Sequence, residues 1–88
     1  MDVRKLVGRN VRQYREKVGV SQEELAYRAG IDRTYVSGIE RGIRNPTVLV
    51  LQDLASVLKV RPADLLADVD STVVKPSAKP RTIPRRRV

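Results

Sequence analysis

Glycine stops divide the first half of the chain into short segments with helical periodicity. The stops are Gly19, Gly30 and Gly42. Glycine readily adopts the left-handed backbone conformation in which helices commonly end. Ahead of the first stop, apolar side chains recur at steps of three and four residues, the period of one helix face. These side chains are Val3, Val7, Val11, Tyr14 and Val18. The pattern predicts a helix over residues 3–18 with this stripe in the core.

A capping box marks the start of a second, shorter helix. The hydroxyl of Ser21 can accept from the backbone N–H of Glu24, while the Glu24 carboxylate can reach back to the N–H of Ser21. We therefore expect a helix that begins at residue 22 and ends at Gly30. Its inward side chains are Leu25, Ala26 and Ala29.

Asp32 is placed to cap a third helix, because its short carboxylate can accept from the N–H of Thr34 or Tyr35. Val36 and Ile39 lie three residues apart on its expected buried face. The link of residues 30–32 is too short for antiparallel helices to lie flat. It favours two short helices that cross steeply, with Ile31 in the corner.

Two more helices complete the expected domain. Thr47 caps the fourth, whose inward side chains are Leu51, Leu54, Ala55 and Leu58. Pro62 suits the first turn of a short fifth helix, in which Leu65 and Leu66 face inward. The domain is expected to span residues 1–68. Residues 69–88 form a Pro-containing tail with too little apolar surface to order by itself, so we expect it to be flexible.

Charge points to a polyanionic partner. The formal net charge is +8, and the tail carries six basic residues and one acidic residue while residues 1–68 carry 12 basic and nine acidic residues. Nucleic acid and an anionic membrane surface would both suit a globular body with a basic tail. Charge alone does not choose between them.

Missing residue types narrow the classes of protein. There is no Cys and no His, so disulfides, thiol nucleophiles and the commonest metal ligand are absent. We expect no metal site, no cofactor and no enzymatic activity. The N-terminal residues have no uninterrupted apolar run, so we expect no signal peptide, no membrane span and a cytoplasmic location.

The run from Ser21 to Thr47 resembles the helix-turn-helix of the lambda-repressor/Cro-like family, which includes phage repressors and restriction-modification controller proteins. The matching residues are Ser21-Gln22-Glu23, Leu25-Ala26, Ala29-Gly30, Ile39-Glu40-Arg41-Gly42 and Asn45-Pro46. With its flanking helices the resemblance covers roughly residues 5–67. It implies an all-α fold, a compact five-helix DNA-binding domain. Arg61 departs from the family pattern, since a capping Ser, Thr or Asp usually stands before the fifth helix.

In this family the third helix, here residues 32–41, lies in the major groove of double-stranded DNA. The resemblance assigns base contacts to the outward positions of this helix: Asp32, Arg33, Thr34, Ser37 and Gly38. Arg33 is the strongest candidate, because its fork matches the two acceptors of guanine. Phosphate contacts are assigned to Gln22, Tyr35, Arg41, Arg44, Asn45 and Arg12. For Gln22, a bracing hydrogen bond to the third helix and a phosphate contact are equal alternatives, and both can exist together. For Tyr35, partial burial in the core and a phosphate contact are equal alternatives. Arg15 and Glu40 match a structural ion pair between the first and third helices.

The resemblance also favours a homodimer that binds a pseudo-palindromic operator as a transcriptional regulator, either a repressor or an activator. The expected dimer interface is formed by Leu65, Leu66 and Val69. An alternative is an antitoxin that regulates its own gene through this domain and binds a protein partner through the tail, where Val73, Val74 and Ile83 could dock. Deletion of residues 70–88 separates the two, because only an antitoxin would lose its partner. An inert tail, or an arm that follows DNA phosphates, remains open as well.

Overall fold

The structure, a computed structural model, describes residues 2–68, which fold into five helices and no strand. They are α1 (Val3–Val18), α2 (Gln22–Ala29), α3 (Arg33–Glu40), α4 (Val48–Leu58) and α5 (Pro62–Leu65). The predicted all-α, five-helix fold is confirmed. The expected tail, residues 69–88, lies outside the described residues. No helix within residues 2–68 is long and apolar enough to cross a membrane.

The helices begin where short polar side chains satisfy their first free N–H groups. Ser21 accepts from the N–H of Glu24 at 3.0 Å, Asp32 from that of Thr34 at 3.1 Å, and Thr47 from that of Val50 at 3.1 Å. The reciprocal half of the predicted capping box is missing, because the Glu24 carboxylate pairs with Arg28 at 2.5 Å. These local bonds fix the starts of α2, α3 and α4.

The start of α5 uses a different cap. Arg61 makes no cap with its own side chain, but its backbone N–H donates to Asp64 Oδ2 at 2.9 Å. This carboxylate replaces the expected capping Ser, Thr or Asp. At the other end of the preceding helix, Lys59 adopts a left-handed conformation with φ 62°, which allows α4 to stop without a glycine.

The core gathers apolar side chains from all five helices. Its members are Val7, Val11, Leu25, Ala26, Ala29, Val36, Ile39, Leu51, Leu54, Ala55, Leu58 and Leu65. The predicted stripe on α1 is wrong at its two ends, since Val3 and Val18 are 53% and 42% exposed. These residues lie at the ends of α1, where fewer neighbours cover the helix. Ile31 and Tyr14 pack against the edge of the core.

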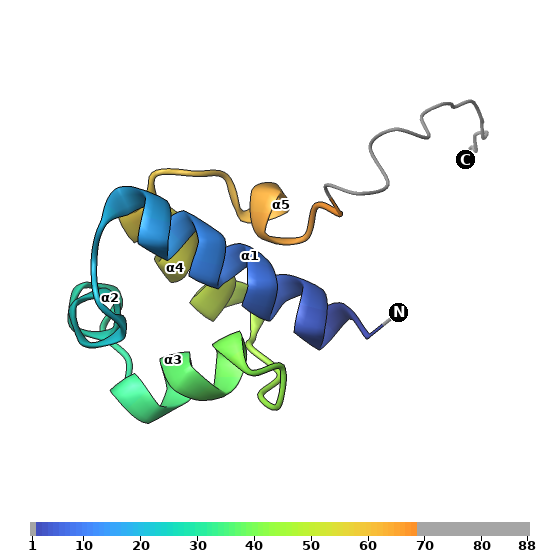
Figure 1. Cartoon of the computed structure of the whole chain (residues 1–88), viewed down its shortest axis with the longest axis horizontal. Helices are drawn as coiled ribbons and strands as arrows, with labels where there is room; N and C mark the ends of the chain where they lie inside the picture. Colours follow the sequence, from blue (N-terminus) through green and yellow to red (C-terminus); the bar gives the residue numbers. More distant parts are fainter. Residues whose placement is uncertain (1, 69–88) are drawn as a thin grey trace.

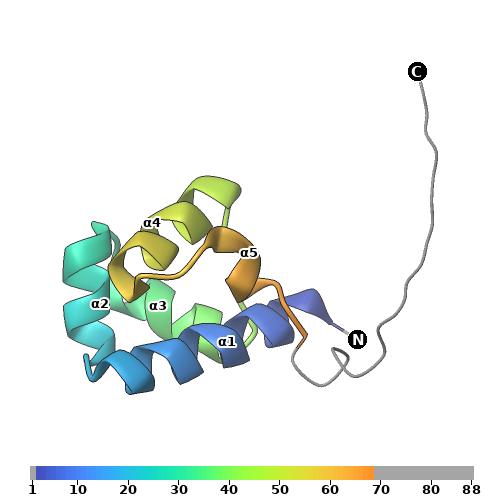
Figure 2. The same ribbon diagram turned by 90° about the horizontal axis from the view of Figure 1, so that it is seen from above.

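The packing sets α3 across the end of α2 and beneath α1. Figure 1 shows α2 viewed along its axis while α3 runs across the view, which is the steep crossing expected from the short link. Both α1 and α2 pack against α3. Figure 2 shows α5 beside the N-terminal half of α1, on the other side of the core from α2. Most of α3 is therefore held by α1 and α2, with one side left uncovered.

A buried asparagine ties α1 to the end of α5, which the sequence analysis missed. Asn10 is 2% exposed, and its Nδ2 donates to the carbonyl oxygens of Leu65 at 2.9 Å and Ala67 at 2.8 Å. These carbonyls lie at the C-terminal end of a helix, where helices lack internal donors. Asn10 therefore supplies the missing donors and fixes the path of the chain after α5.

Replacing Asn10 with alanine is expected to lower the free energy of unfolding by about 2 kcal/mol, because two carbonyls in and near the core lose their donor. Chemical denaturation of the variant measures this loss. The control is Asn45→Ala, at an exposed loop position, which should change stability by less than about 0.5 kcal/mol. Equal effects at the two sites would contradict the role of Asn10.

Candidate nucleic-acid interface

The polar side of α3 faces away from the core. Val36 and Ile39 are fully buried, and Arg33 and Thr34 on the opposite side are exposed, with Ser37 half-buried. Figure 1 shows α3 along the lower edge of the molecule, where no other described helix covers its outer side. The helix runs from Arg33 to Glu40, so the expected range 32–41 includes one residue too many at each end. Asp32 and Arg41 are its caps.

Asp32 caps the start of α3 with one of its two carboxylate oxygens. Oδ2 accepts from the backbone N–H of Thr34 and, in a short contact, from the Thr34 hydroxyl. These hydrogen bonds from Thr34 are the main reason that the pKa of Asp32 lies below its usual range, with the charges of Arg33 and Arg44 adding to the effect. Asp32 is therefore an anion at the tip of the exposed side of α3.

Gly38, which was expected to contact a base, lies on the outward stripe of α3, but another side chain covers it. The residue is buried. A Cβ built on it would lie 2.4 Å from Cγ of Arg44, so the Arg44 side chain lies directly over the glycine. The outward direction predicted for position 38 is correct, but a side chain from the next loop fills the space.

Glu40 is the centre of a polar network that joins three helices. Arg15 of α1 donates to its two oxygens at 2.6 and 3.1 Å, and Gln22 of α2 donates to Oε1 at 2.9 Å. Arg15 also donates to the carbonyl of Val20 at 3.0 Å. The Arg15 and Glu40 side chains are only 13% and 4% exposed. The hydrogen bond to Glu40 raises the pKa of Arg15 above its usual range, and the network fixes α3 against α1 and α2.

The residues expected to contact phosphates are only partly brought together. Arg41, Arg44 and Asn45 are exposed and follow one another in the turn after α3. Tyr35 is half-buried and packs against the core, with the Arg44 guanidinium over its ring. The Gln22 amide makes the bracing bond to Glu40 that was one of its two expected roles.

Arg12 lies on α1, where it pairs with Glu16 at 3.2 Å on an exposed helix face. No contact joins it to the α3 residues among the described interactions. Gly8 and Arg15, four residues before and three residues after Arg12 on α1, both contact the end of α3, so Arg12 lies on the side of α1 that faces α3.

The expected dimer interface is wrong at Leu65. This side chain is fully buried in the core, so it cannot also face a second molecule. Leu66 is 47% exposed and does not face inward as expected. Val69 lies outside the described residues. Leu65 is the last residue of α5 and Leu66 is its C-cap, so the two side chains leave the chain in different directions and only Leu65 reaches the core.

Close packing of α1 on α3 also depends on a glycine that the sequence analysis passed over. A Cβ built on Gly8 would lie 2.3 Å from the carbonyl oxygen of Ile39 and 2.8 Å from that of Glu40. Its signal in the sequence is a glycine inside a helical pattern, which often has a packing reason. Gly8 therefore allows the C-terminal end of α3 to approach α1.

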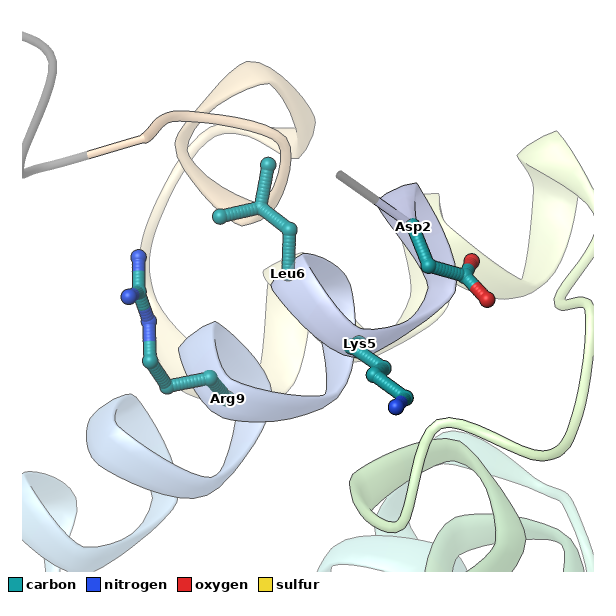
Figure 3. A pocket seen from close by; sticks show the side chains of 4 residues that line it. All are labelled: Asp2, Lys5, Leu6 and Arg9. Carbon is teal, nitrogen blue, oxygen red and sulfur yellow. The ribbon is translucent and has the colours of Figure 1, made fainter.

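A hollow of about 310 Å³ lies on the N-terminal half of α1, lined by Asp2, Lys5, Leu6 and Arg9. Figure 3 shows Leu6 pointing toward α5 and Lys5 pointing away from it. Asp2 caps α1 and pairs with Arg4 at 2.9 Å, and Arg9 lies 3.7 Å from Asp68. Asp2 and Arg9 are thus engaged within the protein, and none of the four lining residues lies on α3.

Two short helices in a steep crossing, the second with its polar side uncovered, define a helix-turn-helix DNA-binding domain. The family model described as "Helix-turn-helix" matches residues 11–65. The chain belongs to the helix-turn-helix family of DNA-binding transcriptional regulators. The resemblance to lambda-repressor/Cro-like proteins is thereby confirmed.

Three relatives illustrate the match. An uncharacterized HTH-type transcriptional regulator of Sinorhizobium fredii is 46% identical over 72 residues, which are 82% of this chain and 94% of the relative. The restriction-modification controller protein C.AhdI of Aeromonas hydrophila has a solved structure with a TM-score of 0.69 and 40% identity, covering 70% of this chain and 94% of that one. SinR, a master regulator for biofilm formation solved in complex with DNA, gives a TM-score of 0.67 and 39% identity, covering 69% of this chain and 98% of that one.

Proposed function

We propose that this protein is a sequence-specific transcriptional regulator that inserts α3 into the major groove of double-stranded DNA. The observation that carries the proposal is the division of α3 into a fully buried apolar side and an uncovered polar side that begins with Arg33 and Thr34. A helix with its polar side exposed fits the width of the major groove. The solved complex of the relative SinR with DNA supports this assignment.

The exposed side of α3 offers complementary groups to base edges. Arg33 can donate two hydrogen bonds to guanine, and Ser37 can donate or accept. The Thr34 hydroxyl donates to Asp32, which leaves its methyl group for thymine and its oxygen as an acceptor. Asp32 uses Oδ2 for the cap, so its Oδ1 can accept from the amino group of cytosine.

Contacts to the sugar-phosphate backbone set the register of α3 in the groove. Arg41 and Asn45 are exposed in the turn after α3, which supports phosphate contacts beside the helix. Gln22 and Tyr35 would reach the sugar-phosphate backbone from α2 and α3, and Arg12 would reach it from α1. Gln22 would use its backbone N–H at the start of α2, because its amide is bonded to Glu40.

A homodimer would present two copies of α3 to a pseudo-palindromic operator with half-sites about one helical turn apart. Leu66 supports this, because it is a large apolar side chain that is 47% exposed beside α5. We infer that the interface includes Leu66 and not Leu65.

Arg33→Ala is expected to lose about 1–3 kcal/mol of binding free energy on the preferred duplex and to relax the preference at one base pair. The reason is the loss of a bidentate contact to a base edge. Competition binding against duplexes that differ by single base pairs measures the effect.

The matched control for Arg33→Ala is Arg61→Ala, which removes the same charge from an exposed position just before α5. It should leave the ranking of DNA sequences unchanged. If Arg33→Ala also left that ranking unchanged, the readout assigned to α3 would be wrong.

A further inference from the structure

Position 38 on α3 is filled by a side chain from outside the helix. A Cβ added to Gly38 would lie 2.4 Å from Cγ, 3.3 Å from Nε and 3.4 Å from Cδ of Arg44. The backbone N–H groups of Ile43 and Arg44 donate to the Gly38 carbonyl oxygen at 3.0 and 3.2 Å. The turn is therefore tied to α3 at Gly38, and the Arg44 stem runs over the glycine.

The charged end of Arg44 points back toward the start of α3. Its Cζ lies 5.6 Å from the centre of the Tyr35 ring, within the range of a cation–π contact. Tyr35 precedes Gly38 by about one helical turn. The guanidinium thus lies beside the N-terminal half of α3, which is the half that contacts base edges in helix-turn-helix proteins.

We propose that Arg44 determines sequence preference by contacting the edge of a guanine, and that Gly38 is a positioning residue that acts through Arg44. This inference rests on the proposed function, because it requires α3 to enter the major groove. It changes the role expected for Arg44, from a phosphate contact to a base contact.

The location of Arg44 favours a base over a phosphate. Gly38 follows Thr34 by four residues, so the two positions share one stripe of the helix. Arg44 lies over that stripe, whereas Arg41 and Asn45 have no such contact with it among the described interactions. A guanidinium on the stripe that enters the groove meets base edges, and its fork matches O6 and N7 of guanine.

The test compares Gly38→Ala, Arg44→Ala and the double variant. In Gly38→Ala the new methyl group displaces Arg44, whose exposed side chain can move, and alanine favours the helix. Thermal unfolding should therefore match the wild type. Binding is measured at physiological salt on the preferred duplex, selected from a random pool, and on all its single-base-pair variants.

We expect each of the three variants to lose about tenfold in preference at the same base pair, the size of a lost bidentate contact. The double variant should bind like Arg44→Ala alone, because Gly38 acts only through Arg44. Arg44→Lys, which keeps the charge without the fork, should lose the same preference and bind unrelated duplexes as the wild type does.

Three results would overturn the inference. The first is an unchanged preference in Gly38→Ala or Arg44→Ala, and the second is losses that add in the double variant. The third is a wild-type preference in Arg44→Lys, which would mean that the fork of the guanidinium is not what reads the base. A wild-type protein without any preferred sequence would refute the proposed function and this inference together, whereas the three results above would leave the proposed function intact.

Discussion

Glu40→Ala is expected to lower the free energy of unfolding by about 3 kcal/mol or more, because it leaves the Arg15 guanidinium without its carboxylate partner at a site with little access to solvent. Arg15 and Gln22 both donate to this carboxylate, and both would lose an acceptor. The loss is measured by chemical denaturation. Operator binding would fall as well, because α3 is fixed through Glu40.

An exposed ion pair provides the control for Glu40→Ala. Glu16 pairs with Arg12 on the surface of α1, so Glu16→Ala should lower stability by less than about 1 kcal/mol. The double variant Arg15→Met with Glu40→Leu should regain most of the lost stability, since it leaves no unpaired charge. A Glu40→Ala protein as stable as Glu16→Ala would contradict the structural role of the network.

Gly8→Ala should lower the free energy of unfolding by about 3 kcal/mol, the upper part of the range for overpacking. The methyl group would lie 2.3 and 2.8 Å from two carbonyl oxygens at the end of α3. These are backbone atoms of a helix that α2 also holds, so relief requires α3 to move as a whole. Thermal and chemical unfolding of the variant measure the loss.

Gly19→Ala is the control for Gly8→Ala. It separates the effect of the close contact between α1 and α3 from the general effect of replacing a glycine. A Cβ added to Gly19 would meet no atom within 4 Å, but the φ of this residue is 89°, so only backbone strain of about 1 kcal/mol is expected. In mid-helix, by contrast, alanine is favoured over glycine. A gain of stability in Gly8→Ala would therefore show that α1 and α3 do not approach this closely.

The parts of the fold that depend on neighbouring residues could be predicted from the sequence. Ser21, Asp32 and Thr47 cap helices because each acts on an N–H two or three residues away. The burial of Val36 and Ile39 follows from their spacing within one helix. These local rules also place Arg33 and Thr34 on the exposed side.

The errors arise where a distant segment decides the outcome. Gly38 is buried by Arg44, which the periodicity of α3 does not include. Asn10 is buried because the carbonyls of Leu65 and Ala67 come to it from a different helix. Whether Leu65 or Leu66 faces inward depends on how α5 packs against α1 and α4, which a helix of one turn does not encode in its own pattern.

Selection of bound duplexes from a random pool by the intact chain at physiological salt tests most directly whether α3 reads DNA sequence. We predict a recovered motif with two related halves about one helical turn apart, in which one conserved guanine per half loses its preference in Arg33→Ala. Recovery of no motif, with binding that disappears as salt is raised toward this level, would mean that only the net positive charge attracts DNA.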